Sequence, residues 1–337
     1  MPVEPVSLSL CAVGAIGALS WGAPRLGHAL LLRGLQPERL PHQSAPQDHG
    51  VAPERVQPLR LPTANGRHLH AMLVRPQGTH TTGWPLVIGM HGWGANAATL
   101  LPLVTPLNEE GIAVLLVDAR CHGLSDEDQF TSLPRFAEDI DAALAWAHQQ
   151  PDIDPQRLAL AGHSVGAGAA LLVAARRHDI RAVLSLSAFA HPAEVMQRWL
   201  RASRIPQRVV GQWVLSHVQR VIGARFEDIA PLRSAARLLC PVLFVHGQDD
   251  QTVPPEDATR LCHAVVHAQA HTLLIPGGHD LNQGLDAHHA PVIQGFFRRA
   301  FSGAIPLHTP SARTTGDDDV HKTPHPTAAA TVQHRCT

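Results

Sequence analysis

The chain has 337 residues, 45% of them hydrophobic, and its 27 basic and 28 acidic side chains give a net charge of −1. This length and composition suffice for one large or two medium globular domains. The near-neutral charge, an aromatic content of 4% and the absence of tyrosine argue against a surface that binds nucleic acid.

The cysteine and histidine patterns favour neither a disulfide framework nor a metal site. The five cysteines are odd in number and form no C-x-x-C pair, so we expect buried free thiols. The 24 histidines are scattered through the chain and are not paired at ligand spacing on one element. We therefore expect no metal and no cofactor.

Residues 6–23 (VSLSLCAVGAIGALSWGA) form an uncharged stretch that reaches the lower length limit of a membrane span. Its Gly, Ala and Ser content makes it only weakly apolar, and Glu4 stands where a secretory signal carries basic residues. Arg25, Arg33 and Arg39 follow, so a spanning helix would leave the main domain in the cytoplasm. The alternative is a helix lying on the domain or on a membrane surface. We expect a cytoplasmic location, with membrane association through residues 6–23 left open.

The pattern that follows predicts an α/β domain. A proline-rich polar linker covers Leu40 to Pro53, and Asn65-Gly66 between two short apolar runs predicts a hairpin with a type I′ turn. Apolar strands then alternate with helical patterns, which predicts a mostly parallel, doubly wound sheet. The predicted strands are Leu86–Met90, Ala113–Asp118, Leu158–Ala161, Ala182–Leu186, Val242–Val245 and Thr272–Ile275, and the predicted helices are Arg135–Gln149, Val165–Arg177, Glu256–His267 and Pro291–Phe301.

Residues 192–239 interrupt this alternation between two predicted strands. The segment is longer than one crossover requires and carries helical patterns around Trp199 and Trp213, so we interpret it as a small helical cap. Its eight arginines fit a solvated helix face better than a surface for anionic substrates or membranes. The predicted organisation is an apolar segment and linker (1–53), a core in two parts (54–191 and 240–302), the cap (192–239), and a disordered tail rich in Pro, Thr, Ala and His (303–337).

Ser164 lies at the centre of the sequence RLALAGHSVGAGAA, between an apolar strand and a run of small residues. A serine at such a strand-to-helix turn adopts a strained conformation, and Gly162 and Gly166 provide the lack of bulk that the turn needs. This arrangement predicts a nucleophile elbow. The alternative is a glycine-rich turn whose serine only caps the helix.

A serine nucleophile needs a base and an orienting carboxylate, which in a parallel sheet must lie beyond the C-terminal ends of the strands. The loop after Val242–Val245 offers Asp249 and Asp250, although loop aspartates are more often turn formers. His279 follows the last strand beside two glycines that let its loop reach back. The order Ser164, Asp250, His279 fits this architecture.

The developing oxyanion requires two main-chain donors. We expect one at the amide of Val165, directly after the serine, and the other at the amide of Trp93 in the HGWG stretch after the strand Leu86–Met90. The alternative for this stretch is a glycine-rich turn with an exposed indole. The loop DARCHGLS (118–125) is predicted to brace the HGWG loop without a catalytic role.

Five motifs in this order resemble the α/β-hydrolase superfamily: HGWG (91–94), DARCHGLS (118–125), GHSVG (162–166), HGQDDQTVP (246–254) and GGHD (277–280). The cap is similar to that of the branch with serine aminopeptidases, monoacylglycerol lipases and bacterial carboxylesterases. The resemblance covers residues 56–301 and implies an α/β-hydrolase fold with Ser164 as nucleophile, His279 as base and Asp250, rather than Asp249, as acid. Cys121 stands where relatives often have glycine.

These observations predict a serine hydrolase of carboxylic esters, such as acyl esters, monoacylglycerols or lysophospholipids, working through an acyl-enzyme. The alternatives are an aminopeptidase, a thioesterase or an acyltransferase with the same triad, and, from another class, a non-catalytic binding module on this fold. The expected partner is a small ester substrate, with no obligate protein partner.

Overall fold

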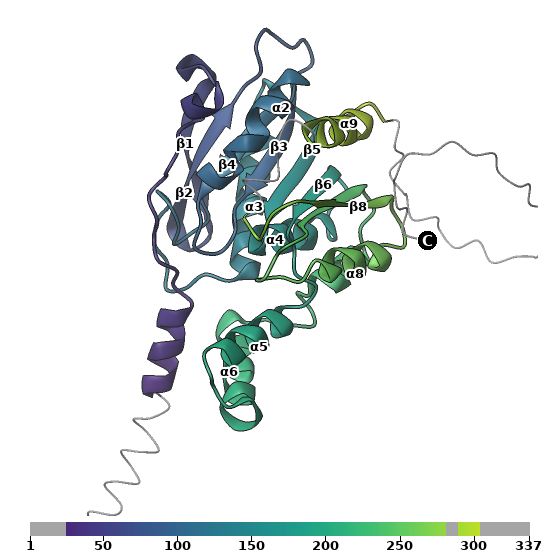
Figure 1. Cartoon of the computed structure of the whole chain (residues 1–337). Coiled ribbons are helices and arrows are strands. Elements are labelled where there is room, and N and C mark those ends of the chain that lie inside the picture. Colours follow the sequence, from purple (N-terminus) through teal and green to yellow (C-terminus); the bar gives the residue numbers. More distant parts are fainter. Residues whose placement is uncertain (1–24, 281–288, 304–337) are drawn as a thin grey trace, which may run out of the picture.

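The computed structural model describes residues 25–280 and 289–303, and in this part of the chain eight strands form one sheet (Figure 1). The strand order is β1-β2-β4-β3-β5-β6-β7-β8. Strands β3 to β8 run parallel to one another, whereas β1 pairs antiparallel with β2 and β2 with β4. The strands are β1 (Val56–Thr63), β2 (Arg67–Val74), β3 (Trp84–Met90), β4 (Ala113–Val117), β5 (Ile153–His163), β6 (Ile180–Leu186), β7 (Val242–Gly247) and β8 (Ala270–Ile275).

Helices cover both faces of this sheet because alternate residues of its inner strands are apolar on both sides. In β3, Leu86 and Ile88 face one core cluster while Val87 faces the other. The first cluster is completed by α3 (Leu133–Ala147), α4 (Val165–Ala174) and α8 (Glu256–Ala264), and the second by α2 (Val104–Glu109) and α9 (Ala290–Phe301). The predicted doubly wound sheet is therefore confirmed.

The predicted elements are present with small changes in their bounds. Asn65 and Gly66 have φ values of 61° and 66°, as a type I′ hairpin requires. Two elements are present that the sequence pattern does not predict: the short helix α2 and the 3-10 helix η4 (Ala97–Leu103) before it. Both are short and η4 contains Pro102, so neither produces a sustained helical period. The remaining 3-10 helices are η1 (Pro46–His49), η2 (Pro53–Arg55) and η3 (Ala64–Gly66).

Residues 192–239, the segment interpreted as a cap, contain four helical elements: α5 (Pro192–Ala202), η5 (Gln207–Gly211), α6 (Gln212–Ile222) and α7 (Pro231–Ala235). Figure 1 shows α5 and α6 beside each other and apart from the sheet. They share a third apolar cluster that includes Leu200, Leu215 and Val218. A helix over residues 25–34 adds Leu31 to this cluster, so the chain before the core contacts the cap.

The segment expected as a linker packs against the core. The Asn96 side chain donates hydrogen bonds to the main-chain oxygens of Leu40 and Pro41, and Val51 is buried. Residues 6–23 and the tail after residue 303 lie outside the described residues, so the predictions for them stay predictions. Within residues 25–280 and 289–303, no helix has both the length and the apolarity to cross a membrane.

The cysteine prediction holds at two positions and fails at one. Cys121 and Cys240 are free and buried. Cys262 is disulfide-bonded, which corrects the expectation of free thiols alone. This bond could not be predicted from the sequence, because neither the number nor the spacing of the cysteines shows which residues the fold brings together.

Candidate active site

Ser164 stands between β5 and α4 with φ 53° and ψ −114°, a conformation that non-glycine residues rarely adopt. The backbone around it is packed so closely that two glycines are required. A Cβ at Gly162 would lie 2.3 Å from the main-chain oxygen of Gly166, and a Cβ at Gly166 would lie 2.3 Å from that of His91. The local geometry is therefore that of the predicted elbow, because a serine that only capped the helix would need no such strain. The Ser164 side chain makes no capping hydrogen bond to the helix.

His279 and Asp250 come from two neighbouring strand ends and are hydrogen-bonded. The ring Nδ1 of His279 lies 2.8 Å from Oδ2 of Asp250. The other carboxylate oxygen accepts from the main-chain N–H groups of Thr252 and Val253, each at 2.8 Å. Asp250 is buried, whereas Asp249 is exposed. Of the two aspartates, only Asp250 is oriented toward the histidine.

The environment of Asp250 keeps it ionised. Burial alone would raise the pKa of this carboxyl, but hydrogen bonds from His246, His279 and the main chain of Val253 outweigh burial and hold the pKa well below its usual range. His246 lies on β7 with Nε2 3.1 Å from Asp250 Oδ2. A carboxylate that is ionised and fixed on three sides can orient the ring of His279.

Ser164 and His279 are neighbours through residue 163. His163 donates from Nε2 to the main-chain oxygen of His279 at 2.8 Å, and the two rings have centroids 4.9 Å apart. Among the contacts of the described residues, no hydrogen bond joins the Ser164 hydroxyl to the His279 ring.

The two predicted oxyanion donors have free main-chain N–H groups. Within the described part of the chain, neither the amide of Trp93 nor that of Val165 donates a hydrogen bond. The Trp93 loop is close to the elbow, since a Cβ at Gly92 would lie 3.2 Å from Cβ of Ser164. Two main-chain donors without an acceptor among the described residues are what an oxyanion would require.

Two buried histidines connect the HGWG loop to the DARCHGLS loop. His122 donates from Nδ1 to the Arg120 main-chain oxygen and accepts at Nε2 from the Gly94 amide. His91 donates to the Gly92 oxygen and accepts from the Ala119 amide. Each ring thus needs one protonated and one unprotonated nitrogen, so both are neutral. The DARCHGLS loop braces the HGWG loop, as its position in the sequence predicted.

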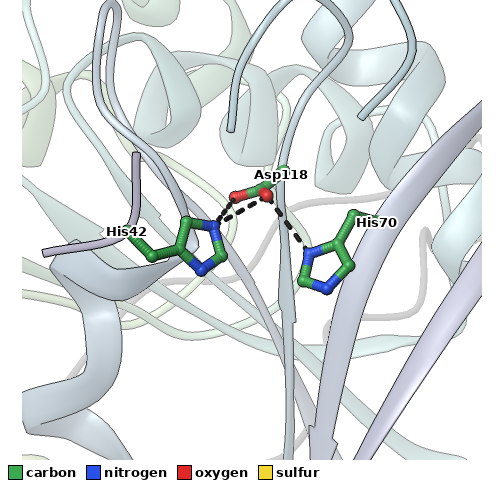
Figure 2. Close-up of side chains that lie close together, drawn as sticks. All are labelled: His42, His70 and Asp118. Atoms are coloured by element: carbon green, nitrogen blue, oxygen red, sulfur yellow. Dashed lines mark hydrogen bonds and ion pairs between the residues drawn. The ribbon is translucent and has the colours of Figure 1, made fainter. Parts of the chain in front are cut away.

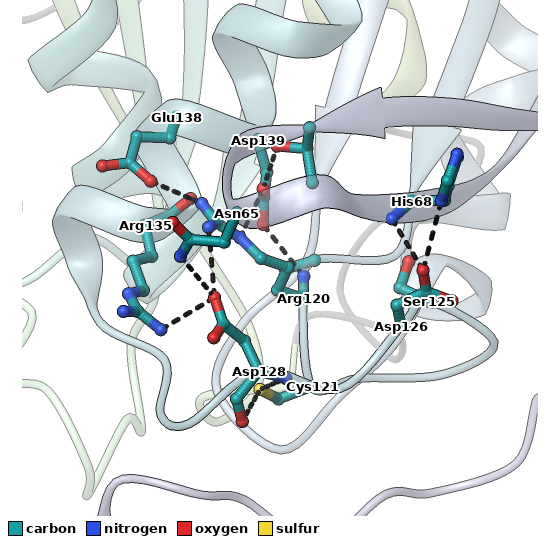
Figure 3. A network of polar contacts seen from close by, with 12 residues as sticks. Asn65, His68, Arg120, Cys121, Ser125, Asp126, Asp128, Arg135, Glu138 and Asp139 are labelled. Carbon is teal, nitrogen blue, oxygen red and sulfur yellow. Dashed lines mark hydrogen bonds and ion pairs between the residues drawn. The ribbon is translucent and has the colours of Figure 1, made fainter.

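The bracing loop is itself anchored to α3 through Arg120, which is fully buried (Figure 3). Its guanidinium contacts Asp139 at 2.9 Å and Glu138 at 2.6 Å, and its main-chain N–H donates to Asp139. Cys121 follows with φ 67°, in the left-handed region that favours glycine. A buried arginine paired in this way fixes the loop and carries no exposed reactive group.

One cluster of potential metal ligands occurs in the described residues: His42, His70 and Asp118 (Figure 2). His42 Nε2 and His70 Nδ1 lie 2.9 and 3.2 Å from the same oxygen of Asp118. The carboxylate also accepts from the amides of Ala97 and Leu124. Burial alone would raise the pKa of Asp118, but these hydrogen bonds hold it well below its usual range. The sequence pattern does not predict this cluster, because its three members are far apart in the chain.

The comparisons with known proteins concern the fold and the family of the chain. Residues 85–231 match the family model described as serine aminopeptidase, S33. An uncharacterised 31.7 kDa protein of Escherichia coli, encoded in the traX–finO intergenic region, is 28% identical over 64% of this chain and 87% of its own length. The YfhR protein of Salmonella typhimurium is 24% identical over 68% of this chain and 76% of its own.

Among solved structures, the esterase Pf2001 of Pyrococcus furiosus has a TM-score of 0.61 at 18% identity and covers 80% of this chain and 98% of its own. A puromycin-hydrolysing peptidase of Mycobacterium tuberculosis has a TM-score of 0.58 at 20% identity, over 75% of this chain and 39% of its own. At such identities the likeness concerns the fold. With its sheet order and its elbow, the chain has the α/β-hydrolase fold, and the match of residues 85–231 to the serine aminopeptidase model supports a hydrolase.

Proposed function

We propose that this protein hydrolyses carboxylic esters through an acyl-enzyme, with Ser164, His279 and Asp250 as a catalytic triad. The observation that supports this most is the 2.8 Å hydrogen bond from His279 Nδ1 to the buried carboxylate of Asp250, next to a serine held in an elbow conformation. A binding module on the same fold would not require this costly arrangement.

In the proposed mechanism, Ser164 Oγ attacks the ester carbonyl while Nε2 of His279 takes its proton. The amides of Trp93 and Val165 donate to the oxyanion that develops. The same imidazole then donates the proton to the leaving alcohol, and the acyl-enzyme is hydrolysed by water activated in the same way. Asp250 keeps the Nδ1 proton of His279 in place throughout. No step requires a metal.

Apolar side chains near the proposed triad support an acyl substrate. Val165 directly follows the nucleophile and Val253 lies three residues after the acid, and both pack with the apolar cluster that contains Phe189 and the cap residue Met196. Apolar surroundings of this kind favour a hydrocarbon chain over a charged peptide end. The second candidate is an aminopeptidase, favoured by the description of the matching family model; a thioesterase or an acyltransferase would use the same triad.

The first experiment tests the nucleophile. A fluorophosphonate probe and p-nitrophenyl butyrate are offered to the wild-type protein, to Ser164→Ala, and to Ser302→Ala, an exposed serine after α9. We expect Ser164→Ala to abolish labelling and to lower turnover by at least about 1,000-fold, because the attacking oxygen is lost. Ser302→Ala should behave as wild type. Equal labelling of Ser164→Ala and wild type would contradict the proposal.

A panel of p-nitrophenyl acyl esters and aminoacyl p-nitroanilides then separates the two substrate classes. An esterase should prefer the esters by a large factor in kcat/KM, whereas an aminopeptidase should hydrolyse the aminoacyl amides. Labelling at Ser164 together with activity on the aminoacyl amides alone would support the triad and would favour a peptide substrate over an ester.

A further inference from the structure

The loop that carries His279 packs against the end of β7: the Gly277 oxygen accepts from the Asp249 amide at 2.9 Å, and a Cβ at Gly247 would lie 2.3 Å from the Gly278 oxygen. Gly277 has φ 113°, and a Cβ placed there would meet nothing within 4 Å. A Cβ at Gly278 would meet only the Asp249 oxygen, at 4.0 Å. These two glycines have no side chains with which to anchor the loop, and a general base must be held to within a fraction of an ångström. A restraint on the backbone of residue 279 itself therefore matters for its position.

Two side chains from central strands supply it at the main-chain oxygen of His279. His163, the last residue of β5, donates from Nε2 at 2.8 Å. Ser187, directly after β6, donates from Oγ at 3.4 Å. Ser187 has φ 49°, a strained conformation at a strand end. The carbonyl of the proposed base is therefore fixed to the same sheet edge that carries the proposed nucleophile.

The proton on His163 is determined by this contact. A carbonyl oxygen only accepts, so Nε2 must carry the hydrogen, and in the neutral ring Nδ1 is then unprotonated. Burial, with His279 as its neighbour, lowers the pKa of His163 to about 4. The ring is thus a neutral donor at neutral pH, and its Nε2 is occupied by the carbonyl. It is not placed to compete with His279 as a base.

The opposite edge of the His163 ring faces the HGWG loop. A Cβ at Gly92 would lie 2.9 Å from Nδ1 of His163. One side chain therefore lies between the loop of the proposed oxyanion donor and the loop of the proposed base, and it precedes the nucleophile in the chain.

We propose that His163 is a positioning residue: its Nε2–H bond to the main-chain oxygen of His279 sets the place of the base relative to Ser164, with Ser187 as a weaker second donor. The proposal rests on the proposed function, since it assigns His163 to the same reaction. It explains why the strand end preceding the serine carries a side chain that can both donate a hydrogen bond and fill the space beside Gly92.

The test compares two substitutions of one residue. His163→Phe keeps a ring of similar size and removes the donor, whereas His163→Gln keeps an N–H that can reach the carbonyl. We expect His163→Phe to lower kcat for p-nitrophenyl butyrate by about 10- to 100-fold, the loss that a misplacement of about 1 Å produces, with KM changed less than about twofold. His163→Gln should recover most of that loss. Ser187→Ala should lower kcat by less than His163→Phe, because its bond is longer.

The controls separate positioning from folding. The exposed His263 on α8 gives a matched variant, His263→Phe, which should have wild-type kcat. Urea unfolding at pH 7 is measured for all variants, and kcat is calculated per active site titrated with the fluorophosphonate probe. If His163→Phe does not fold, the proposal is tested by comparing kcat of His163→Gln with kcat of Ser187→Ala. A kcat for His163→Gln far below that of Ser187→Ala would contradict the proposal.

Three further results would overturn the inference. A folded His163→Phe with wild-type kcat would show that the donor is not needed, and His163→Gln as impaired as His163→Phe would show that the ring acts by its shape alone. A change confined to KM would point to a substrate contact. If the wild-type protein is not labelled at Ser164, the proposed function fails and the role of His163 fails with it. If the wild-type protein is labelled and one of the three results above is found, only the role of His163 fails.

Discussion

At the scale of single residues, the two adjacent aspartates after β7 differ in burial and in the side chains that they contact. Asp250 is buried and contacts two histidine rings, while Asp249 is exposed. The residue types in this loop alone do not distinguish Asp249 from Asp250. Their difference arises because the turn directs one side chain under the loop of residue 279 and the other into solvent.

This difference gives a prediction with an internal control. Asp250→Asn should lower kcat of the proposed esterase by about 1,000- to 10,000-fold, because an amide can no longer hold the productive tautomer of His279. Asp249→Asn should retain wild-type activity within about twofold. The measurement is steady-state hydrolysis of p-nitrophenyl butyrate, and equal activities of the two variants would exclude Asp250 as the acid.

At the scale of elements, the contact of the α4 N-terminus with the end of β3 fixes the elbow. Gly166, in the first turn of α4, approaches the main-chain oxygens of both Met90 and His91. Because these atoms belong to backbone at the centre of the sheet, they cannot move aside for a side chain. The elbow and the HGWG loop are consequently one packed unit.

We therefore expect Gly166→Ala to destabilise the fold severely. A Cβ there would lie 2.3 Å from two main-chain oxygens, a contact that forces the helix away from the strand and should cost more than about 3 kcal/mol. Gly34→Ala is the matched control, because a Cβ at Gly34 meets nothing within 4 Å. The check is the free energy of unfolding in urea, and similar values for the two variants would contradict this reading of the packing.

At the scale of the whole molecule, neutral histidines join the loops of the site, and they make stability depend on pH. Burial, aided by the nearby His91, lowers the pKa of His122 to about 3, and burial lowers that of His163 to about 4. The folded state resists protonating these rings, while the unfolded chain takes up protons below its ordinary histidine pKa of about 6.5. Their contribution is therefore present above that pH and is lost as the pH falls.

Acidification should thus weaken the fold before the carboxylates titrate. Between pH 7 and pH 5, the buried His122 alone should cost about 2 kcal/mol of unfolding free energy, and the partly exposed His163 should add less. His42 acts in the opposite direction, since its hydrogen bond to Asp118 raises its pKa and its contribution is lost as pH rises. Urea unfolding at the two pH values tests the balance, and equal stabilities would contradict the neutral assignment.

The sequence by itself determined the strand and helix pattern, the elbow and the helical nature of residues 192–239. These features are local, since hydrophobic periodicity, the placement of glycines and runs of small residues are each read from a few consecutive residues. Its assignment of Ser164, Asp250 and His279 came from motif order and still awaits the experiments above. The chain pattern also identified the DARCHGLS loop as a brace, because it follows the strand beside β3.

The tertiary structure alone decided which distant groups meet. His42, His70 and Asp118 converge from three separate segments, and the linker around residue 40 packs because the side chain of Asn96 binds its backbone. The bond of Cys262 and the contact of His163 with residue 279 are likewise invisible in the sequence. Contacts between residues about a hundred positions apart form because the strand order and the paths of the loops bring strand ends together. A local sequence pattern contains no information on the spatial distance between such residues.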